Sequence, residues 1–388
     1  MSFGVYIHIP YCIQRCSYCD FATYVQSEIL PPSQYVDLLN EEIKQHSFFQ
    51  PQPLDTIYFG GGTPSLIEAS LIVSLISALE KRGFVRSPEA EVTIEINPAT
   101  VDERKLEVYL QHGINRFSVG AQTFDDQLLK RVKREHNAEQ TLQTLRLLKK
   151  YNLNFSFDIL FALPSQTKDG LNRDLEIAVE LGAKHISPYC LTVPSGHPLS
   201  KARPSDEDQV EMFNLIREKL EDFGYVQYEI SNFSLPGFES RHNNLYWSDD
   251  EYWGLGLSAH SYSRESSWGT RFWNPSNIGA YQALIQSHSG KTYKRPDQSL
   301  DTSHFEILKS NQSLTDLCHT FLRRSLGLSP AVVERKFGAR VLRSVETRLT
   351  KLRERELLHF DGGHWRLTSQ GRLMSNLVFE ELTFLEPV

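Results

Sequence analysis

The sequence has no long hydrophobic run, no excess of basic charge and only five cysteines in 388 residues. No stretch approaches the roughly 18 consecutive apolar residues that a membrane-spanning helix needs. The formal net charge of −7 gives no general support for nucleic-acid binding. Strand-forming residues begin almost at the first position, which leaves no room for a signal or transit peptide. We therefore expect a chain without a transmembrane segment or an export signal.

Three of the five cysteines, Cys12, Cys16 and Cys19, follow directly after the apolar run Val5–Ile9, which has the length of a strand and is ended by Pro10. The C-x3-C-x2-C spacing lets a short loop fold around one corner of an iron–sulfur cubane, whose iron is normally held by thiolate. Three thiolates leave one iron of a [4Fe–4S] cluster open to a small molecule, as catalytic zinc sites keep one open position.

Other interpretations of this cysteine loop stay open. A structural zinc site normally has four closely spaced ligands, and His8 could supply the fourth, although it lies inside the expected strand. The cysteines could also cluster by chance. A disulfide framework is disfavoured, because three cysteines cannot pair evenly and no secretory signal precedes them. We favour the iron–sulfur site.

The motif C-x3-C-x-Y-C, with Tyr18 before the last cysteine, resembles the signature of the radical S-adenosylmethionine (SAM) superfamily. The wider string YIHIPYC…CxYCDF, which begins at Tyr6, resembles its HemN/HemW family of oxygen-independent coproporphyrinogen III oxidases and haem chaperones. In this superfamily the open iron binds the amino and carboxylate groups of SAM. The resemblance implies that the three cysteines hold a [4Fe–4S] cluster. Such an oxygen-sensitive cluster, with reduced cysteines and no export signal, favours a cytoplasmic location.

A strand expected at Thr56–Phe59 opens into three glycines, Gly60 to Gly62, and then Thr63. Glycines let backbone amides approach a ligand closely, although the same run could simply form a tight turn. The run resembles the family's GGGTP motif, which receives the amino group of SAM. We therefore expect Gly61, Gly62 and Thr63 to contact SAM.

Two carboxylates lie in the strands that follow. Glu95, near the end of the strand Glu91–Asn97, would by itself most often face solvent. Asp158 is the one charge in the apolar strand Phe155–Phe161, and a carboxylate there is costly to bury without a partner. The resemblance implies that Glu95 bonds SAM and that Asp158 bonds its ribose.

The remaining cofactor positions come from the resemblance alone. Arg134 would otherwise pass as one more member of a mixed charge run. Lys133 and Ala162 stand where the family usually has glycine, which suggests local adjustments of the backbone. In total the resemblance assigns these SAM contacts: Tyr6, Tyr18, Gly61, Gly62, Thr63, Glu95, Gln122, Arg134 and Asp158.

Six strand–helix units in succession predict parallel strands with right-handed crossovers. The motif residues recur at the carboxyl ends of these strands, where β/α barrels place their active sites. The sequence therefore predicts an α/β fold with a partial (β/α)6 radical SAM barrel at residues 1–195. Cys190, in the sixth expected strand, His185–Leu191, is interpreted as a buried small apolar residue.

Residues 196–299 are rich in aromatic side chains and glycine and contain His242 and His260. Such a region suits a flat ligand, but the residues alone favour ordinary packing of the two histidines. Histidine is also a common haem ligand. The strings around these histidines resemble the HNxxYW and GxGxxAHS blocks of the haem-chaperone branch, where HNxxYW is tied to haem binding. The resemblance makes His242 the haem-contact candidate in a region that completes the barrel.

Residues 300–388 have a different character. Helices are expected at Ser303–Lys309, Leu314–Ser325, Ser329–Phe337 and Arg340–Glu356, followed by a hairpin around Asp361-Gly-Gly. This order predicts a smaller winged-helix-like α+β domain. DNA binding would be one use for it, but its arginines are interrupted by glutamates, which favours a solvated helix face. We expect no nucleic-acid partner.

Two departures separate this chain from the oxidases. Phe21 stands where they carry a fourth cysteine, and only four residues precede Val5, where they carry a longer segment. We therefore expect a haem chaperone that binds a [4Fe–4S] cluster, SAM and haem and passes haem to an acceptor, such as a respiratory protein, with transient membrane-protein contact. An oxygen-independent coproporphyrinogen III oxidase is the alternative, and a redox-sensing transcription regulator a distant third. No catalytic residue is assigned.

Overall fold

The computed structural model describes residues 2–301 and 303–386. Its strands are β1 (Phe3–Ile9), β2 (Tyr11–Cys12), β3 (Tyr24–Val25), β4 (Leu54–Gly61), β5 (Arg86–Ile96), β6 (Arg116–Gln122), β7 (Asn154–Phe161), β8 (His185–Cys190), β9 (Val226–Glu229), β10 (Asn232–Ser234), β11 (Glu251–Leu255), β12 (His260–Ser263), β13 (Thr270–Trp273), β14 (Phe305–Ile307), β15 (Leu358–Asp361) and β16 (His364–Leu367). Its helices are α1 (Pro32–Gln45), α2 (Ala69–Lys81), α3 (Glu103–Gln111), α4 (Asp126–Arg131), α5 (Ala138–Lys150), α6 (Lys168–Glu180), α7 (Asp206–Asp222), α8 (Arg241–Tyr246), α9 (Ile278–Ser287), α10 (Pro296–Ser299), α11 (Ser310–Arg323), α12 (Pro330–Phe337), α13 (Ala339–Glu354), α14 (Ser369–Leu373) and α15 (Ser375–Glu381).

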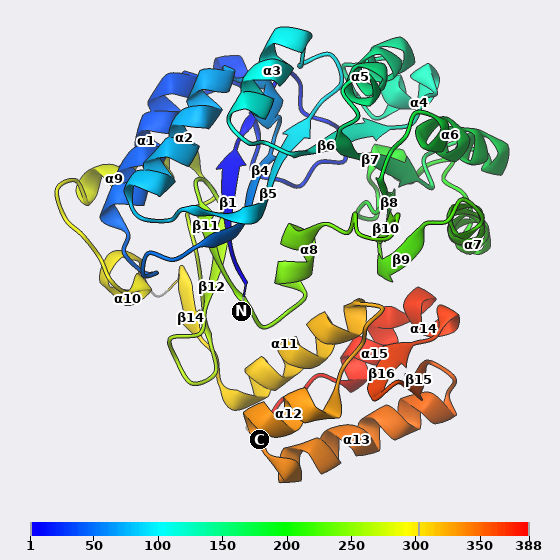
Figure 1. Ribbon diagram of the computed structural model, residues 1–388. Helices are drawn as coiled ribbons and strands as arrows, with labels where there is room; N and C mark the ends of the chain where they lie inside the picture. Colours follow the sequence, from blue (N-terminus) through cyan, green and yellow to red (C-terminus); the bar gives the residue numbers. More distant parts are fainter. Residues whose placement is uncertain (1, 302, 387–388) are drawn as a thin grey trace.

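A curved sheet of twelve strands forms the body of the molecule (Figure 1). Its centre consists of β1 and β4 to β8, each parallel to its neighbour. The predicted α/β fold with a partial (β/α)6 barrel is therefore confirmed. Strand β11 pairs parallel to β1, and antiparallel strands then extend both edges, β12 to β14 on one side and β10 and β9 on the other.

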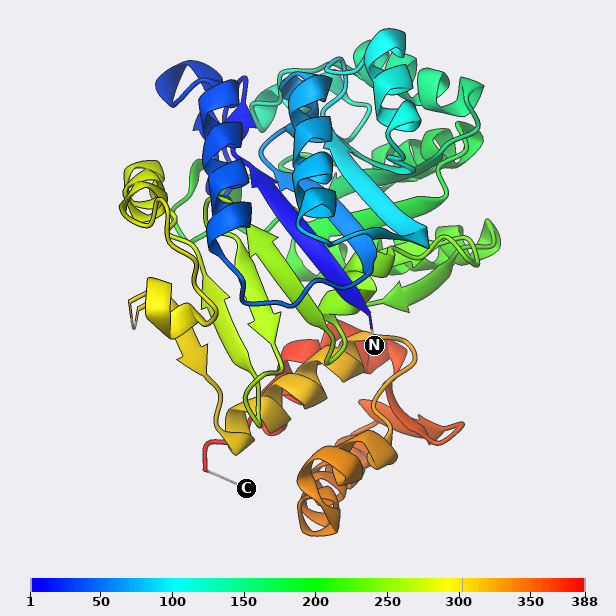
Figure 2. The ribbon, with the colours of Figure 1, turned by 60° about the vertical axis from the view of Figure 1, so that its left-hand side comes forward.

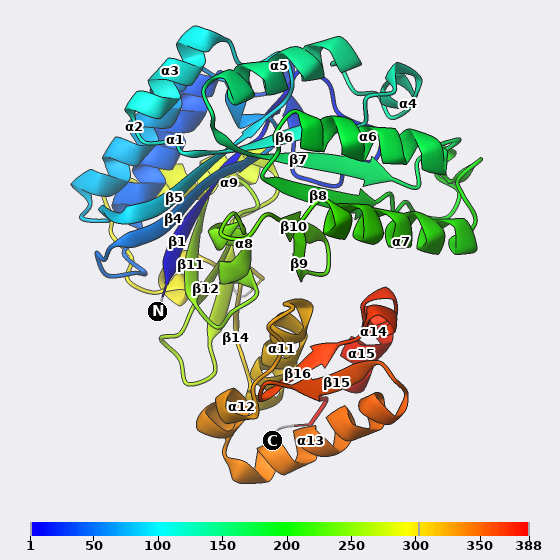
Figure 3. The same ribbon diagram turned by 45° about the vertical axis from the view of Figure 1, so that its right-hand side comes forward.

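Helices cover the outer face of the parallel strands, as Figure 3 shows for α1 to α3, α5 and α6. The central strands are largely buried on both faces because each lies between these helices and the barrel interior. Side-chain caps start some of these helices: Asp102 accepts from the amide of Lys105 in α3, and Asn137 forms a capping box with Gln140 in α5. The main hydrophobic core consequently lies between sheet and helices.

The helix predicted at Ser303–Lys309 is wrong, because Phe305–Ile307 form strand β14. This strand pairs antiparallel with β13, with Phe305 opposite Phe272. A segment this short cannot form a stable helix by its own hydrogen bonds, whereas an existing sheet edge supplies partners for its backbone.

Residues from α11 onward build a second, smaller core with their own buried leucines. Strands β15 and β16 form the predicted hairpin, with Gly362 and Gly363 at positive φ in its turn. Figures 1 and 2 place this group of helices beside the end of the sheet where β1 begins, away from the carboxyl ends of the parallel strands. None of the helices in the described residues is long and apolar enough to cross a membrane.

Lys133 and Ala162, which replace glycines of the family pattern, have φ values of +57° and +60°. Both therefore adopt the left-handed conformation that glycine accepts most easily. Lys133 is exposed, so its side chain gains little packing in return.

We expect Lys133→Gly to raise the free energy of unfolding by about 1 kcal/mol, because a left-handed backbone costs a residue with a Cβ roughly this much. Urea unfolding of both proteins measures the change. The matched control is Lys130→Gly: Lys130 is exposed and helical in α4, where glycine should destabilise by about 1 kcal/mol. Loss of stability in both variants would contradict the assignment of strain to Lys133.

Candidate functional site

The three cysteines lie on the loop that follows β1, at the carboxyl end of the parallel strands. The loop is held by backbone hydrogen bonds from Tyr24 to Pro10 (2.8 Å) and from Ser17 to Val132 (3.2 Å). Among the described residues, no three His, Cys, Asp or Glu side chains lie close enough together to bind a single metal ion. A cubane makes a different demand, because each thiolate binds a separate iron.

Two glycines let the loop after β4 pack directly against the cysteine loop. The amide of Gly62 donates to the carbonyl of Ile9 (2.9 Å), and that of Thr63 donates to the carbonyl of Tyr11 (2.7 Å). A Cβ on Gly62 would lie 2.6 Å from the Tyr11 carbonyl oxygen. Gly61 has a φ of +114°, and a Cβ there would meet the ring of His8. A side chain at Gly62 would therefore push the two loops apart, and one at Gly61 would displace the ring of His8.

A cavity of about 550 Å³ opens between these loops and the barrel interior. All three cysteines line it, together with eight of the nine expected SAM contacts: Tyr18, Gly61, Gly62, Thr63, Glu95, Gln122, Arg134 and Asp158. Tyr6, the ninth, is not among the lining residues. Its hydroxyl instead contacts Nδ1 of His8 (3.0 Å) and its ring stacks on Tyr58, so Tyr6 supports the wall from behind.

The two carboxylates face this cavity from neighbouring parts of the sheet. Tyr58 donates its hydroxyl to Glu95 (2.9 Å), and the amide of Gly61 donates to the other carboxylate oxygen (3.1 Å). Burial raises the pKa of Glu95 to about 7. Asp158 accepts from the hydroxyl of Ser118 (3.2 Å), and burial raises its pKa as well. Both carboxyl groups can thus accept hydrogen bonds from a ligand or attract a positively charged group on it.

Arg134 joins the cysteine loop to the barrel. Its guanidinium donates to Sγ of Cys16 (3.5 Å) and to the carbonyl of Gly120. Gln122, at the end of β6, has a φ of +69° and is nearly buried. Arg134 therefore places its positive charge beside the cysteine loop at Cys16.

The interpretation of Cys190 as a buried residue is wrong. The last two residues of β8, Tyr189 and Cys190, are exposed and line the cavity, whereas the first four residues of the strand are buried. The Sγ atom of Cys190 lies 3.5 Å from Oε1 of Gln209. Apolar neighbours in sequence gave no signal of this exposure.

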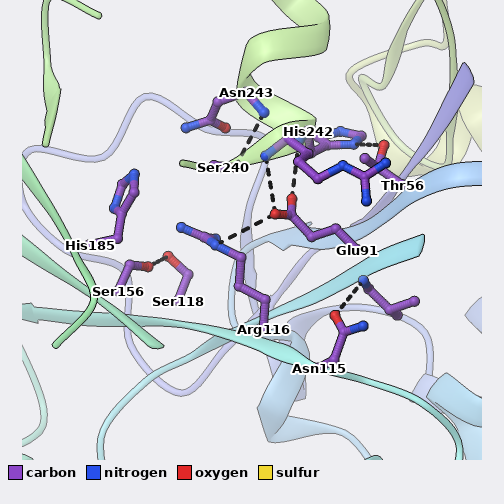
Figure 4. A network of polar contacts seen from close by, with 12 residues as sticks. Thr56, Glu91, Asn115, Arg116, Ser118, Ser156, His185, Ser240, His242 and Asn243 are labelled. Atoms are coloured by element: carbon purple, nitrogen blue, oxygen red, sulfur yellow. Dashed lines mark hydrogen bonds and ion pairs between the residues drawn. The ribbon is translucent and has the colours of Figure 1, made fainter. Parts of the chain in front are cut away.

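The HNxxYW segment lies in α8, at the amino end of the parallel strands (Figure 1), and Figure 4 shows its polar contacts. Glu91 accepts hydrogen bonds from the backbone amides of Arg241 (3.1 Å) and His242 (3.0 Å). The ring of His242 contacts Thr56 through Nδ1 (2.7 Å) and Tyr246 through Nε2 (2.9 Å). His242 is only 1% exposed to solvent.

This environment supports packing rather than ligation for His242. Both ring nitrogens have partners, the ring stacks on Tyr58 with centroids 5.1 Å apart, and burial lowers the pKa of His242 to about 3. The neighbouring residue, Asn243, does line the cavity. Several other lining residues carried no motif by which the sequence could identify them: Arg116, Ser118, His185, Ser187 and Asn243.

We expect His242→Ala to destabilise the protein by about 2–4 kcal/mol, because it removes a buried ring and leaves the hydroxyls of Thr56 and Tyr246 without their partner. Urea unfolding measures this loss. His359→Ala, on the exposed face of β15, is the control and should change stability by less than about 0.5 kcal/mol. Equal stability of the two variants would show that the His242 ring is not a packing element.

Comparisons with known proteins agree with this arrangement. The family model described as "Radical SAM superfamily" matches residues 6–178, and the HemN C-terminal domain matches residues 321–374. The haem chaperone HemW of Bacillus subtilis (strain 168) is 33% identical over 97% of this chain and 98% of its own length. HemW of Lactococcus lactis is 32% identical over 97% and 96%.

A solved structure of the coproporphyrinogen III oxidase HemN from Escherichia coli, described as a radical SAM enzyme, superposes with a TM-score of 0.81. It covers 98% of this chain and 90% of its own at 20% identity, so this likeness concerns the fold. The sequence identity to the two HemW proteins exceeds 30% along nearly their whole length, so it identifies the family more narrowly than the likeness in fold does. The chain belongs to the HemW family within the radical SAM superfamily.

Proposed function

We propose that this protein is a haem chaperone: it binds a [4Fe–4S] cluster, SAM and haem, and it transfers haem to an acceptor protein. The observation that carries the proposal is full-length similarity to proteins named as haem chaperones, combined with a cavity that gathers the cysteines and the SAM-contact candidates. The acceptor, such as a respiratory haem protein, and a cytoplasmic location belong to the proposal as well.

The residues present fit the cluster and SAM. Cys12, Cys16 and Cys19 would hold three irons, with Arg134 beside Cys16. Gly61 and Gly62 pack so closely against His8 and Tyr11 that a Cβ would clash, and both line the cavity beside the cysteines. Glu95 and Asp158 would accept hydrogen bonds from SAM inside the cavity. Such a cluster, when reduced, supplies an electron to bound SAM, while the protein orients the two and excludes water.

The haem contact of the HNxxYW segment needs a change in this geometry. For His242 to bind iron, its contacts with Thr56 and Tyr246 would have to break. The proposal therefore places haem near α8, and His242 becomes a ligand only if the segment opens.

The oxidase alternative is less well supported. Phe21, which replaces the fourth cysteine of the oxidases, lines the cavity and is 67% exposed, so an apolar ring stands where a thiol would be. Similarity in fold to the Escherichia coli oxidase does not by itself transfer the activity.

The deciding experiment uses anaerobically reconstituted protein. We expect it to bind haem, to pass haem to an apo-acceptor protein, and to leave coproporphyrinogen III unconverted in the presence of SAM and a strong reductant. Absorption spectra follow haem, and chromatography follows the porphyrins. Conversion to protoporphyrinogen, or failure to bind haem, would overturn the chaperone proposal. A variant with Ala at all three cysteines should lose iron and sulfide, whereas Cys190→Ala should keep them.

We further expect SAM affinity to increase by about tenfold between pH 6 and pH 8 through Glu95. With a pKa of about 7, Glu95 is mostly protonated at pH 6 and must lose its proton to accept from SAM; at pH 8 it is already ionised. Isothermal titration at both pH values measures the change. The α-amino group of SAM also titrates near this range, so Glu95→Gln is the control. An undiminished pH dependence in Glu95→Gln would exclude Glu95 as its source.

A further inference from the structure

The inner end of the cavity contains a buried arginine without a hydrogen-bond acceptor. Arg116, the first residue of β6, is 2% exposed and lines the cavity. Its guanidinium donates no hydrogen bond to any protein atom in the described residues, and its Nε is buried without a partner. Arginine carries five N–H donors, and burying such a charge unpaired is costly. The N–H donors of Arg116 at this end of the cavity therefore lack acceptor atoms.

The carboxylate of Glu91 does not supply these acceptor atoms. Oε2 of Glu91 lies 3.9 Å from Nε of Arg116, which is too long for a hydrogen bond. Glu91 is instead engaged by the backbone amides of Arg241 and His242 at the start of α8. Its charge partly offsets that of Arg116 across the gap, but the donors of the guanidinium stay free.

The surroundings indicate which ligand chemistry fits. Figure 4 shows Arg116 between Glu91 on one side and His185 and Ser118 on the other, with Asn243 on the far side of the guanidinium. His185 is occupied by the hydroxyl of Tyr228 (2.8 Å), and Ser118 bonds Asp158. The negative charges of Glu91 and Asp158 disfavour a doubly charged phosphate. A single carboxylate matches the planar donor pair of arginine and carries half that charge.

We propose that Arg116 anchors a carboxylate of the ligand that shares this cavity with SAM. One source is a propionate of haem, in which case the inference rests on the proposed function; the other is a free small carboxylate. With SAM bound, a cavity of about 550 Å³ has no room for a second whole ligand of moderate size. A tetrapyrrole would therefore reach Arg116 with a side chain only, while its ring stays outside.

The first experiment tests the carboxylate site without haem. The reconstituted full-length protein is heated in sodium formate and, separately, in sodium chloride of equal ionic strength. We expect formate to raise the melting temperature of the wild type, to raise it less in Arg116→Lys, which keeps the charge but not the planar fork, and to have no specific effect on Arg116→Met. Arg82→Met is the matched control: Arg82 is half-buried and bonds Ser47 outside the cavity, so formate should still stabilise this variant.

The second experiment distinguishes the sources of the carboxylate. Haem and haem dimethyl ester, which has no free carboxylate, are titrated into the same four proteins. If a propionate reaches Arg116, the wild type and Arg82→Met should prefer haem by roughly tenfold or more, and Arg116→Met should bind both alike. Equal binding of both by the wild type, with an Arg116-dependent formate effect, would support a free small carboxylate.

The two proposals fail in different ways. If neither haem nor its ester binds the wild type, the chaperone function fails, while the formate arm still decides the role of Arg116. If formate acts equally on Arg116→Met and the wild type, and the preference for haem over its ester is the same in both, the carboxylate anchor is overturned.

Discussion

Two backbone hydrogen bonds between the loops after β1 and β4 are the contact on which the site depends. The Ile9 and Tyr11 carbonyls accept from Gly62 and Thr63, and the loops can come this close at Gly62 only because Gly62 has no Cβ. Because β1 and β4 are adjacent and parallel, their carboxyl ends bring both loops to the same edge of the sheet. The cysteines and Glu95 consequently face one cavity, although they lie far apart in the sequence.

The other end of the barrel is closed by a different kind of contact. Glu91 holds the start of α8 by two backbone amides, and His242 fixes the segment to Thr56 and Tyr246. The C-terminal helices then pack beneath it: Arg323 lies over the ring of Trp247 at 4.4 Å. The HNxxYW segment is thus both the floor of the cavity and the support of the C-terminal domain, so opening it for haem would disturb both.

The sequence could predict those parts of the site that lie at or near the carboxyl ends of strands. Residues after β1, β4, β5, β6 and β7 were expected to lie together, and eight of the nine SAM-contact candidates line one cavity with the cysteines. The directions of individual side chains could not be predicted in this way. Tyr6 points to His8, and His242 points to the hydroxyls of Thr56 and Tyr246. The prediction that Cys190 is buried is wrong, because Cys190 faces the cavity instead of the core. The sequence likewise did not predict strand β14, because its partner β13 is distant in the sequence.

The cysteine spacing, the glycine run and the alternation of strands and helices by themselves determined the barrel and the edge at which its chemistry lies. These features are local: each depends on the conformational freedom or the hydrophobic period of a few consecutive residues. Only the tertiary structure decided that Arg116 would be buried with no hydrogen-bond acceptor, 3.9 Å from the carboxylate of Glu91. Whether a buried charge is satisfied depends on the atoms that other segments place around it, and the pattern of one strand holds no record of those atoms.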